Sequence, residues 1–310
     1  MGIVKAICIS DRRGTQKYGI EEAKLKEEWG IEGDAHGGTW HRQISLLSYD
    51  RIEEFKEKGA DIDFGAFGEN LVVEGFDFRK LPVGTRLQCN AAIIEMTQIG
   101  KECHTHCQIY HRMGDCIMPR EGVFAKVIKG GTIRVGDRME IIEAGEGRPF
   151  RVAVITLSDK GSKGEREDKS GPAIVSMMEE QGYEVVETMV LPDEQSLIEK
   201  ELIRLSDGRQ VDLILTTGGT GLSVRDVTPE ATLAVATRNV PGIAEAIRAY
   251  SMQITKRAML SRGVSVLRNN TLIINLPGSP KAVKESLEII LSELDHGLGI
   301  LKGSASECAR

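Results

Sequence analysis

A glycine-rich segment, T-T-G-G-T-G at residues 216–221, has the residue types needed to bind an anion. Gly218, Gly219 and Gly221 carry no Cβ atom, so the backbone there can turn with positive φ and bring several N–H donors close to a phosphate. Thr220 adds a hydroxyl donor. The segment matches neither G-x-x-x-x-G-K-[ST] nor G-x-G-x-x-G, and a purely structural turn is the alternative interpretation. The residue types alone therefore predict an anion or nucleotide site.

Two aspartates occur in polar segments of the same half of the chain. Asp193 lies in L-P-D-E-Q and Asp226 lies in R-D-V-T-P-E. Mg²⁺ binds hard oxygen ligands, commonly one or two carboxylates together with substrate phosphates. A metal ion beside backbone amides suits nucleotidyl transfer, which depends on positioning and on neutralising charge at phosphorus. The alternatives are that Asp193 is only the N-cap of the next helix and that Asp226 is a solvated loop charge.

Another polar segment, N-L-P-G-S-P-K at residues 275–281, is typical of the start of a helix. Ser279 before Pro280 predicts an N-cap followed by proline at the first helical position. Such a helix end directs free N–H groups and a partial positive charge towards a nearby anion. Ser279 could also be a cap and nothing more. The polar pair Ser158-Asp159 follows a predicted strand and would face the same ligand.

A second cluster of reactive side chains occupies one short stretch, in which Cys103, Cys107 and Cys116 alternate with His104, His106 and His111. Positive neighbours favour the thiolate form of a cysteine, and sulfur transfer requires a thiolate. Zinc bound by the three cysteines and a histidine is an alternative. The spacing C-x₃-C-x₈-C differs, however, from the C-x₂-C pairs of common structural zinc sites. Inert packing cysteines are a further alternative.

The elements that must position the first group of residues alternate between strands and helices from residue 151 onward. Strands are predicted at residues 152–157, 184–191, 213–217, 265–267 and 272–276, and helices at about 172–181, from 193, at 229–236, at 241–259 and from 280. This alternation predicts a mostly parallel sheet with helices on both faces. Ligands bind beyond the carboxyl ends of such strands, which is where the glycine-rich segment and both aspartates fall.

Residues 1–142 predict a β-rich domain. Strands are expected at residues 3–9, 43–47, 70–73, 86–87 and 91–96, with one helix at about 49–58. Two short strands, 132–135 and 138–142, flank a Gly-Asp turn and predict a closing hairpin. Residues 143–150 are polar and contain glycine, so we expect a linker there, a second domain at 151–303 and a tail at 304–310.

The composition fits two globular domains. The chain has 310 residues, of which 41% are hydrophobic and 28% charged. A net charge of −6 argues against a general nucleic-acid binder, because phosphate backbones reward clustered Lys and Arg. No apolar run approaches the roughly 20 residues of a membrane span, and residues 1–10 are a poor match to a signal peptide, so we expect no membrane partner. We therefore expect a cytoplasmic protein.

Five segments resemble, in their order and spacing, the molybdopterin adenylyltransferase family over about residues 151–303. They are L-P-D-E-Q, T-T-G-G-T-G, R-D-V-T-P-E-A-T, L-S-R and N-L-P-G-S-P-K. The resemblance implies reaction of molybdopterin with ATP, assisted by Mg²⁺, to give adenylyl-molybdopterin and pyrophosphate. It also implies a homo-oligomer, with a trimer favoured, and contact with other molybdenum-cofactor enzymes. A close branch of the family is assigned to tungsten cofactors.

The resemblance also assigns candidate site residues. Asp193 and Asp226 match the two functional aspartates, which would hold Mg²⁺. The candidate residues for binding ATP and molybdopterin are Ser158, Asp159, Gly218, Gly219, Thr220, Gly221, Ser261, Pro277, Gly278, Ser279 and Lys281.

Residues 1–142 resemble a MOSC domain, a β-rich fold found in molybdenum-cofactor sulfurases. The matching segments are G-I-E-G-D-A-H-G-G at 30–38, H-R-Q-I-S-L-L at 41–47, F-G-E-N-L at 67–71 and the closing G-G-x-I-x-x-G-D. The resemblance aligns the functional cysteine with Cys103, which would carry sulfur or contact molybdenum. Glu102 stands where the family usually has proline. For His36 and His41, a structural role in a loop and the lining of a pocket are equally supported.

Two hypotheses follow. The first is an enzyme that adenylylates molybdopterin, built as a β-rich MOSC-type barrel followed by an α/β three-layer, mostly parallel sheet of the molybdopterin-binding type. The second is a non-catalytic molybdopterin-binding or scaffold protein with a zinc-binding or inert N-terminal domain. The pair Asp193 and Asp226 favours the first, because binding alone does not need two carboxylates beside a triphosphate.

Overall fold

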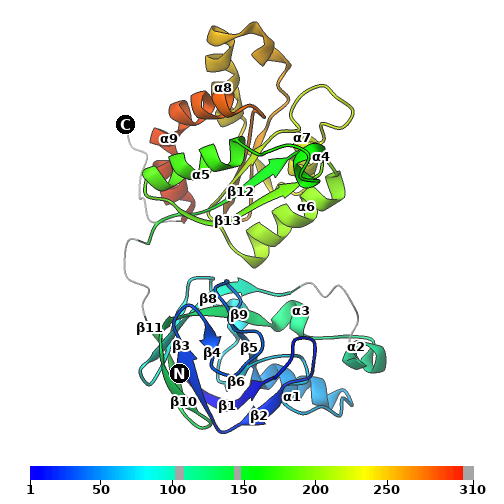
Figure 1. Cartoon of the computed structure of the whole chain (residues 1–310), viewed down its shortest axis with the longest axis vertical. Helices are drawn as coiled ribbons and strands as arrows, with labels where there is room; N and C mark the ends of the chain where they lie inside the picture. Colours follow the sequence, from blue (N-terminus) through cyan, green and yellow to red (C-terminus); the bar gives the residue numbers. More distant parts are fainter. Residues whose placement is uncertain (102–107, 143–147, 303–310) are drawn as a thin grey trace. The chain divides into compact units, whose positions relative to one another are not determined.

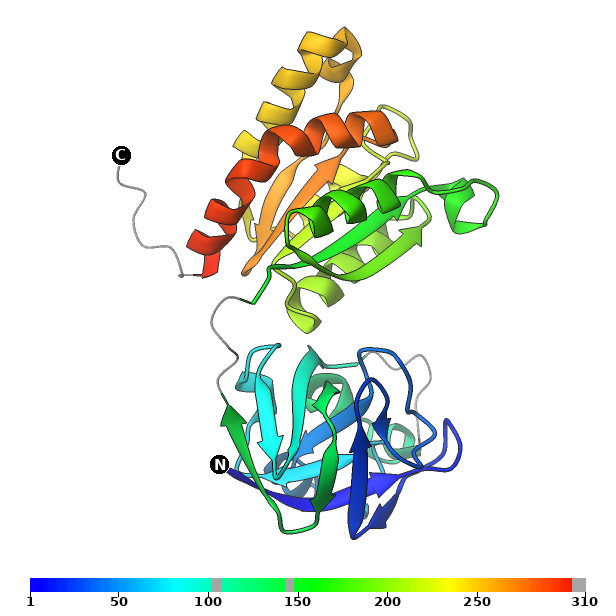
Figure 2. The same ribbon diagram turned by 60° about the vertical axis from the view of Figure 1, so that its left-hand side comes forward.

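The computed structural model of the chain describes residues 1–101, 108–142 and 148–302. The chain folds as two compact units, Met1–Glu146 and Gly147–Arg310, and each has its own hydrophobic core. Figures 1 and 2 show both units, coloured by position in the sequence. Cys103, Cys107, His104 and His106 lie outside the described residues.

The first unit is built around a closed barrel of seven strands, which confirms the predicted β-rich barrel. Its strands are hydrogen-bonded in the order β11–β7–β8–β9–β5–β6–β1, and β11 pairs with β1 to close the ring. The strands are β1 (Gly2–Ile9), β5 (Ile44–Ser48), β6 (Leu71–Glu74), β7 (Arg86–Cys89), β8 (Ala92–Ile99), β9 (Val123–Lys129) and β11 (Arg138–Ile142).

Smaller elements complete this unit. The strand β2 (Tyr18–Ile20) pairs with β1, and β10 (Gly131–Arg134), β3 (Glu22–Lys26) and β4 (Gly30–Ile31) form a separate small sheet. Short helical elements connect the strands; those in the described residues are α1 (Tyr49–Glu57), η1 (Phe78–Lys80), α2 (Gln108–Met113) and α3 (Met118–Glu121).

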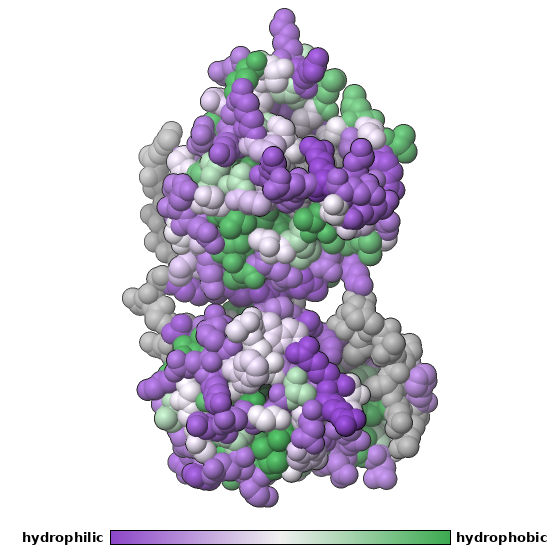
Figure 3. All heavy atoms as spheres, viewed as in Figure 1, coloured by the Kyte–Doolittle hydropathy of each residue, from purple (hydrophilic) through white to green (hydrophobic). Residues whose placement is uncertain are grey.

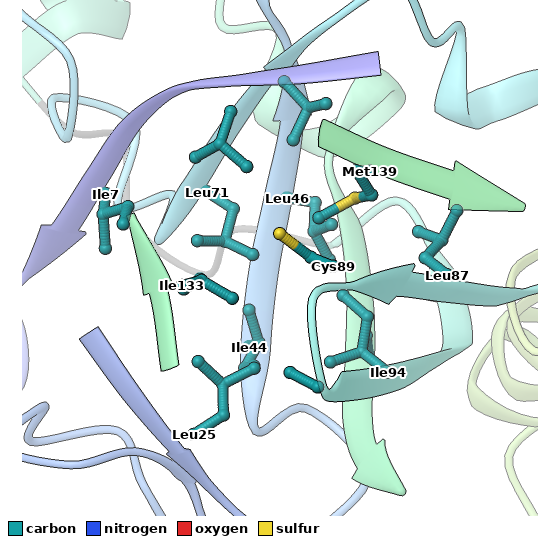
Figure 4. Close-up of a cluster of buried hydrophobic side chains, with 14 of the residues drawn as sticks. Ile7, Leu25, Ile44, Leu46, Leu71, Leu87, Cys89, Ile94, Ile133 and Met139 are labelled. Atoms are coloured by element: carbon teal, nitrogen blue, oxygen red, sulfur yellow. The ribbon is translucent and has the colours of Figure 1, made fainter. Parts of the chain in front are cut away.

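The interior of the barrel is apolar. Side chains alternate across a strand, so every second residue faces the centre. Figure 4 shows Ile7, Leu46, Leu71, Leu87 and Ile94 converging there, and each is buried. A second buried cluster under α1 covers the outer side of β1, β5 and β6. All five residues of β5 are buried for this reason.

The predicted closing hairpin is wrong. The strand β10 pairs with β3, whereas β11 pairs with β7 and β1. The turn between β10 and β11 is hydrogen-bonded to Val4 of β1. The N–H of Val4 donates to the carbonyl of Asp137 (2.9 Å), and the N–H of Gly136 donates to the carbonyl of Val4 (2.8 Å). These contacts direct the two strands into different sheets.

The second unit contains a six-stranded sheet in the order β13–β12–β14–β17–β16–β15. The strands β13, β12, β14 and β17 are parallel, and β16 and β15 are antiparallel to their neighbours. The bounds are β12 (Arg151–Leu157), β13 (Glu184–Leu191), β14 (Leu213–Thr217), β15 (Arg238–Asn239), β16 (Ser265–Arg268) and β17 (Thr271–Leu276). The predicted strand positions are confirmed, but the two-residue edge strand β15 was too short to show an apolar pattern.

Helices pack against both faces of this sheet. Leu213 and Leu215 belong to one buried cluster with α5, α8 and α9, whereas Ile214 belongs to a second cluster with α6 and α7. Successive side chains of β14 point to opposite faces of the sheet, so they pack into two separate hydrophobic clusters. The helices are α4 (Asp159–Ser162), α5 (Ser170–Glu180), α6 (Gln195–Ile203), α7 (Thr228–Ala234), α8 (Pro241–Ile254) and α9 (Pro280–Lys302).

Two helices differ in extent from the prediction. The helix expected at 241–259 is interrupted at Thr255, which is extended and whose hydroxyl accepts a hydrogen bond from the N–H of Arg257 (3.4 Å). The 3₁₀ helix η3 (Lys256–Leu260) follows that break. The helix expected from Asp193 begins at Gln195 and continues as the π-helical turn η2 (Arg204–Gly208).

Within the described ranges, no helix combines the length and apolarity needed to cross a membrane. Hydrophilic residues cover most of the face of each unit in Figure 3, and apolar residues form separate patches between them. The most exposed apolar side chains include Leu222 and Val224, which follow the glycine-rich segment.

Candidate active site

The site is built where four parallel strands end. The strands β12, β13, β14 and β17 run in the same direction, so their carboxyl ends share one edge of the sheet. The segments that leave them begin at Ser158, Pro192, Gly218 and Pro277. The sheet therefore brings together segments that are widely separated in the sequence.

The glycine-rich segment turns sharply after β14. Gly218 and Gly219 have φ values of 98° and 64°, which favour glycine. A Cβ atom on Gly219 would collide with the hydroxyl of Thr228 and lie 2.9 Å from Oδ1 of Asp193. A Cβ atom on Gly221 would lie 2.8 Å from Oδ2 of Asp226. Both aspartates therefore lie against the same loop.

Asp193 is held by a reciprocal pair of hydrogen bonds with Asp159. The N–H of Asp159 donates to Oδ2 of Asp193 (3.0 Å), and the N–H of Asp193 donates to Oδ1 of Asp159 (3.1 Å). The N-cap of α6 is Glu194, and its side chain makes no capping bond. The alternative that Asp193 only caps this helix is therefore wrong.

The other carboxylate oxygen of Asp193 is poised for a cation. Its Oδ1 is buried and has no hydrogen-bond partner among the residues that the structure describes. Burial raises the pKa of Asp193, and the negative charges of Asp159 and Asp226 act in the same direction. A buried acceptor without a donor is costly unless a cation or a donor completes it. This oxygen therefore fits a role as a Mg²⁺ ligand.

Few further protein ligands surround that oxygen. In the described part of the chain, no group of three or more His, Cys, Asp or Glu side chains is arranged to hold a metal ion. A Mg²⁺ ion held by Asp193 and Asp226 would complete its coordination with water and phosphate oxygens. Such incomplete protein ligation is usual where Mg²⁺ arrives with a nucleotide.

Asp226 closes a tight turn, and Arg262 fastens that turn. Oδ2 of Asp226 accepts a hydrogen bond from the N–H of Ser223 (2.9 Å). Arg262 donates through Nε to the carbonyl of Gly221 (2.6 Å) and through Nη2 to the carbonyl of Asp226. Its backbone N–H donates to the carbonyl of Thr220 (2.9 Å). The sequence prediction selected Ser261 and missed Arg262, although both belong to L-S-R.

The loop after β17 packs on the glycine-rich loop. The hydroxyl of Thr217 donates to the carbonyl of Pro277 (2.6 Å), and that of Ser170 donates to the carbonyl of Gly278 (2.9 Å). A Cβ atom on Gly278 would lie 3.3 Å from Cα of Gly218. Oγ of Ser279 accepts a hydrogen bond from the N–H of Ala282 (3.2 Å), as expected of an N-cap at the start of α9.

Three other candidate residues make local contacts. Oγ of Ser158 caps α4 by accepting a bond from the N–H of Gly161 (3.0 Å). Oγ of Ser261 accepts a long bond from the N–H of Gly263 (3.4 Å). Lys281, whose side chain is 83% exposed, pairs with Glu285 on the next turn of α9 (3.8 Å). These three side-chain contacts are each made within one segment around the site.

A cavity of about 520 Å³ opens beside Asp193. Its lining consists of Asp193, Glu194, Gln195, Ser196, Glu199, Arg225 and Val227. Arg225 also forms two hydrogen bonds to Asp159 (2.9 and 2.7 Å), which link it to the Asp193 pair. The sequence prediction missed Arg225 and the first turn of α6. The side chain of Arg225, next to Asp226, was the available signal.

The first unit places its motif residues in a buried polar cluster. Lys17 and Asp34 form an ion pair of 2.9 Å, and their side chains are 2% and 0% exposed. Asp34 also accepts bonds from the N–H of Ser10 (2.9 Å) and from Nδ2 of Asn70 (3.1 Å). Nδ1 of His36 lies 3.4 Å from Oγ of Ser10 and faces this cluster. The G-D-A-H and E-N segments therefore meet in the fold.

The predicted sulfur site has only one of its cysteines in the described residues. Cys116 is buried and packs with Met118 and Phe124. Cys103 and Cys107 lie outside the described residues. Nε2 of His41 lies 3.0 Å from Oε1 of Gln98 on β8, which is a structural contact.

Comparison with known proteins finds a different family in each of the two units. A family model described as "Probable molybdopterin binding domain" matches residues 153–296, and the MOSC domain model matches residues 32–140. The molybdopterin adenylyltransferase of Escherichia coli K12 is 46% identical over 142 residues, which cover 45% of this chain and 72% of that protein. The one from Helicobacter pylori J99 is 41% identical over 157 residues, which cover 50% of this chain and 89% of that protein.

Among solved structures, the molybdopterin biosynthesis enzyme MoaB from Thermus thermophilus is 48% identical, with a TM-score of 0.48. The match covers 50% of this chain and 97% of that one. The high identity of the curated relatives, over most of their length, identifies the family. The chain belongs to the molybdopterin adenylyltransferase family and combines that family's domain with a MOSC domain.

Proposed function

We propose that the second unit transfers the adenylyl group of ATP to molybdopterin in a reaction that requires Mg²⁺. The observation that carries this proposal is the placement of Asp193 and Asp226 against one glycine-rich loop at the carboxyl edge of the sheet. The curated relatives named molybdopterin adenylyltransferase support the same reaction.

In this reaction an acceptor oxygen of molybdopterin attacks the α-phosphorus of ATP. One P–O bond forms to that oxygen, and the bond to the pyrophosphate leaving group breaks. The amides of Gly218 to Gly221 and the hydroxyl of Thr220 would bind phosphate oxygens, and Asp193 and Asp226 would hold Mg²⁺. When bound, Mg²⁺ supplies neutralisation of the phosphate charge. Rigid loops would keep the reacting groups in line, which is the main requirement of phosphoryl-group chemistry.

The remaining candidate residues complete the proposed site. Ser158 and Asp159 follow β12, and Ser261 follows η3. Pro277, Gly278 and Ser279 lie between β17 and α9, and Lys281 is in the first turn of α9. We assign these residues to the binding of ATP and molybdopterin. The domain limits that accompany this proposal are 1–142, a linker at 143–150, 151–303 and a tail at 304–310, with the second domain a three-layer sheet of the molybdopterin-binding type.

The decisive experiment is incubation of the full chain with molybdopterin, Mg²⁺ and ATP labelled at the α-phosphate. Label should appear in the pterin product, and omission of Mg²⁺ should prevent this. Asp226→Ala should leave pterin binding nearly intact and lower ATP consumption at least about 100-fold, because it removes a metal ligand. Glu245→Ala, an exposed change on α8, is the control. Equal turnover in Asp226→Ala would refute the assignment of Asp226 as a catalytic metal ligand. Absence of turnover in the wild type would favour a binding or scaffold protein.

For the first unit we propose that Cys103 carries sulfur or contacts molybdenum or molybdopterin. The match of the MOSC family model to residues 32–140 supports this. Cys103→Ser should abolish sulfur loading, as measured by persulfide labelling of the full chain. Stoichiometric zinc in the wild-type chain that is lost in Cys103→Ser would instead establish the metal-site alternative.

A further inference from the structure

Arg225 is the basic side chain in the lining of the 520 Å³ cavity, which otherwise carries the acidic residues Asp193, Glu194 and Glu199. Its guanidinium is turned to Asp159, with Nε 2.9 Å from Oδ2 and Nη2 2.7 Å from Oδ1. The two side chains are 56% and 37% exposed. Solvent screens a pair this exposed even in bidentate geometry, so a group of higher charge can displace the Asp159 carboxylate.

The backbone that carries Arg225 is fixed, although its side chain is exposed. The N–H of Asp226 donates to the carbonyl of Ser223 (3.0 Å), and the N–H of Ser223 donates to Oδ2 of Asp226 (2.9 Å). Arg262 ties both sides of this turn through the carbonyls of Gly221 and Asp226. Arg225 can therefore change its partner by rotating its side chain, without movement of the loop.

Asp159 keeps its place when Arg225 leaves. Oδ1 of Asp159 accepts the N–H of Asp193 (3.1 Å), and the N–H of Asp159 donates to Oδ2 of Asp193 (3.0 Å). These two bonds do not involve Arg225. Opening of the Arg225–Asp159 pair therefore leaves the Asp193 carboxylate in position.

We propose that Arg225 is a phosphate-binding residue that pairs with Asp159 as long as no phosphate ligand is bound. The guanidinium leaves Asp159 for the pyrophosphate part of a nucleoside triphosphate when that part enters the cavity. This inference rests on the proposed adenylylation. Guanidinium binds phosphate oxygens bidentately, and a pyrophosphate group carries more negative charge than a single carboxylate, so the exchange favours the ligand. Without ligand, the pair with Asp159 neutralises the guanidinium beside the loop.

The test exploits two variants that should act in opposite directions. Binding of magnesium pyrophosphate to the full chain is measured by titration calorimetry. Arg225→Ala should weaken binding about 10- to 100-fold, the range expected for the loss of charge-assisted hydrogen bonds. Asp159→Asn should tighten binding about threefold or more, because the guanidinium is no longer held by a competing carboxylate. If the pair is merely structural, both variants bind more weakly, and the proposal is overturned.

A double variant separates release of Arg225 from the simple loss of a negative charge. Asp159→Asn combined with Arg225→Ala should bind like Arg225→Ala alone, because the gain requires the guanidinium. A gain that persists in the double variant overturns the proposal. Arg225→Lys should bind with intermediate affinity, since it keeps the charge but not the planar fork. Arg238→Ala, an exposed change on β15, should match the wild type.

The same preparations separate this inference from the proposed function. Label transfer from ATP is measured for each variant, and thermal unfolding verifies that each one is folded. A wild-type chain that forms no adenylyl product refutes the adenylylation and, with it, this inference. A wild-type chain that forms product, while Arg225→Ala binds magnesium pyrophosphate as tightly as the wild type, refutes this inference alone.

Discussion

Single residues decide whether the first unit can hold its buried charges. Lys17 and Asp34 are almost fully removed from solvent, and burial lowers the pKa of Lys17 although Asp34 opposes the shift. Each charge is satisfied by the other and by the Ser10 and Asn70 contacts of Asp34. A buried pair of this kind makes the loss of one partner far more costly than loss of both.

Asp34→Ala should therefore lower the free energy of unfolding of the first unit by about 3–5 kcal/mol, because it removes the carboxylate that pairs with the buried ammonium of Lys17. Urea unfolding followed by tryptophan fluorescence measures this unit selectively, since both tryptophans, Trp29 and Trp40, lie in it. Glu22→Ala breaks the exposed pair with Arg134 and should cost less than about 1 kcal/mol. Equal costs for the two variants would contradict the role of the buried pair.

Buried Glu69 should make the stability of the first unit depend on pH. Burial raises the pKa of Glu69 from 4.5 to about 7, and its carboxylate accepts bonds from the N–H groups of Gly65 (2.7 Å) and Phe67 (3.0 Å). The folded state thus keeps a proton that the unfolded chain releases. The stability contributed by this group is full below about pH 4.5 and is lost as the pH rises through about 7, a change of about 3 kcal/mol.

Glu69→Gln should remove this dependence. The unfolding free energy of the wild type, relative to that of the variant, should fall between pH 5 and pH 7.5 when both are followed by tryptophan fluorescence. Parallel curves for the two proteins across that range would show that Glu69 does not titrate there. Glu57, an exposed residue at the end of α1, provides the control variant Glu57→Gln.

At the scale of elements, the second unit depends on the loop between β14 and α7. Its positive φ values and its close approach to Asp193 and Thr228 leave no room for a side chain at Gly219. The loop is fixed on one side by Arg262 and on the other by the hydroxyl of Thr228, which donates to the carbonyl of Gly218 (3.0 Å).

Gly219→Ala should displace Asp193 and reduce label transfer from ATP by at least about 100-fold, because small errors of position are costly in transfer reactions. It should also lower stability by about 1–3 kcal/mol through strain at positive φ. Gly297→Ala is the matched control: a Cβ there meets open space within α9, and alanine favours a helix. Calorimetry and the label-transfer assay give both quantities. Wild-type activity in Gly219→Ala would mean that the loop does not position Asp193.

At the scale of the whole molecule, the two units carry separate hydrophobic cores. We expect Asp34→Ala to lower the midpoint of the tryptophan-detected thermal transition while leaving the temperature at which label transfer is lost within about 2 °C of the wild type. Loss of both signals at one lowered temperature would show instead that the units unfold as one.

Patterns among neighbouring residues were sufficient to predict the positions of many strands and helices of this protein. Apolar runs and turn residues located β12, β13, β14 and β17. Three of these strands, β12, β14 and β17, are buried at every residue, and a strand covered on both faces leaves a continuous apolar run in the sequence. The Ser279-Pro280 cap was predicted for the same reason, since capping involves residues three positions apart. The motif order also indicated the family.

Contacts between distant residues were decided only by the tertiary structure. The reciprocal bonds of Asp159 and Asp193 join residues 34 positions apart, and the Arg225–Asp159 pair spans 66 positions. The pairing of β10 with β3, in place of the predicted hairpin with β11, likewise depends on where β1 lies. A side chain carries no local sign of a partner that folding brings to it, so the sequence could name the carboxylates but not the arginines that hold and face them.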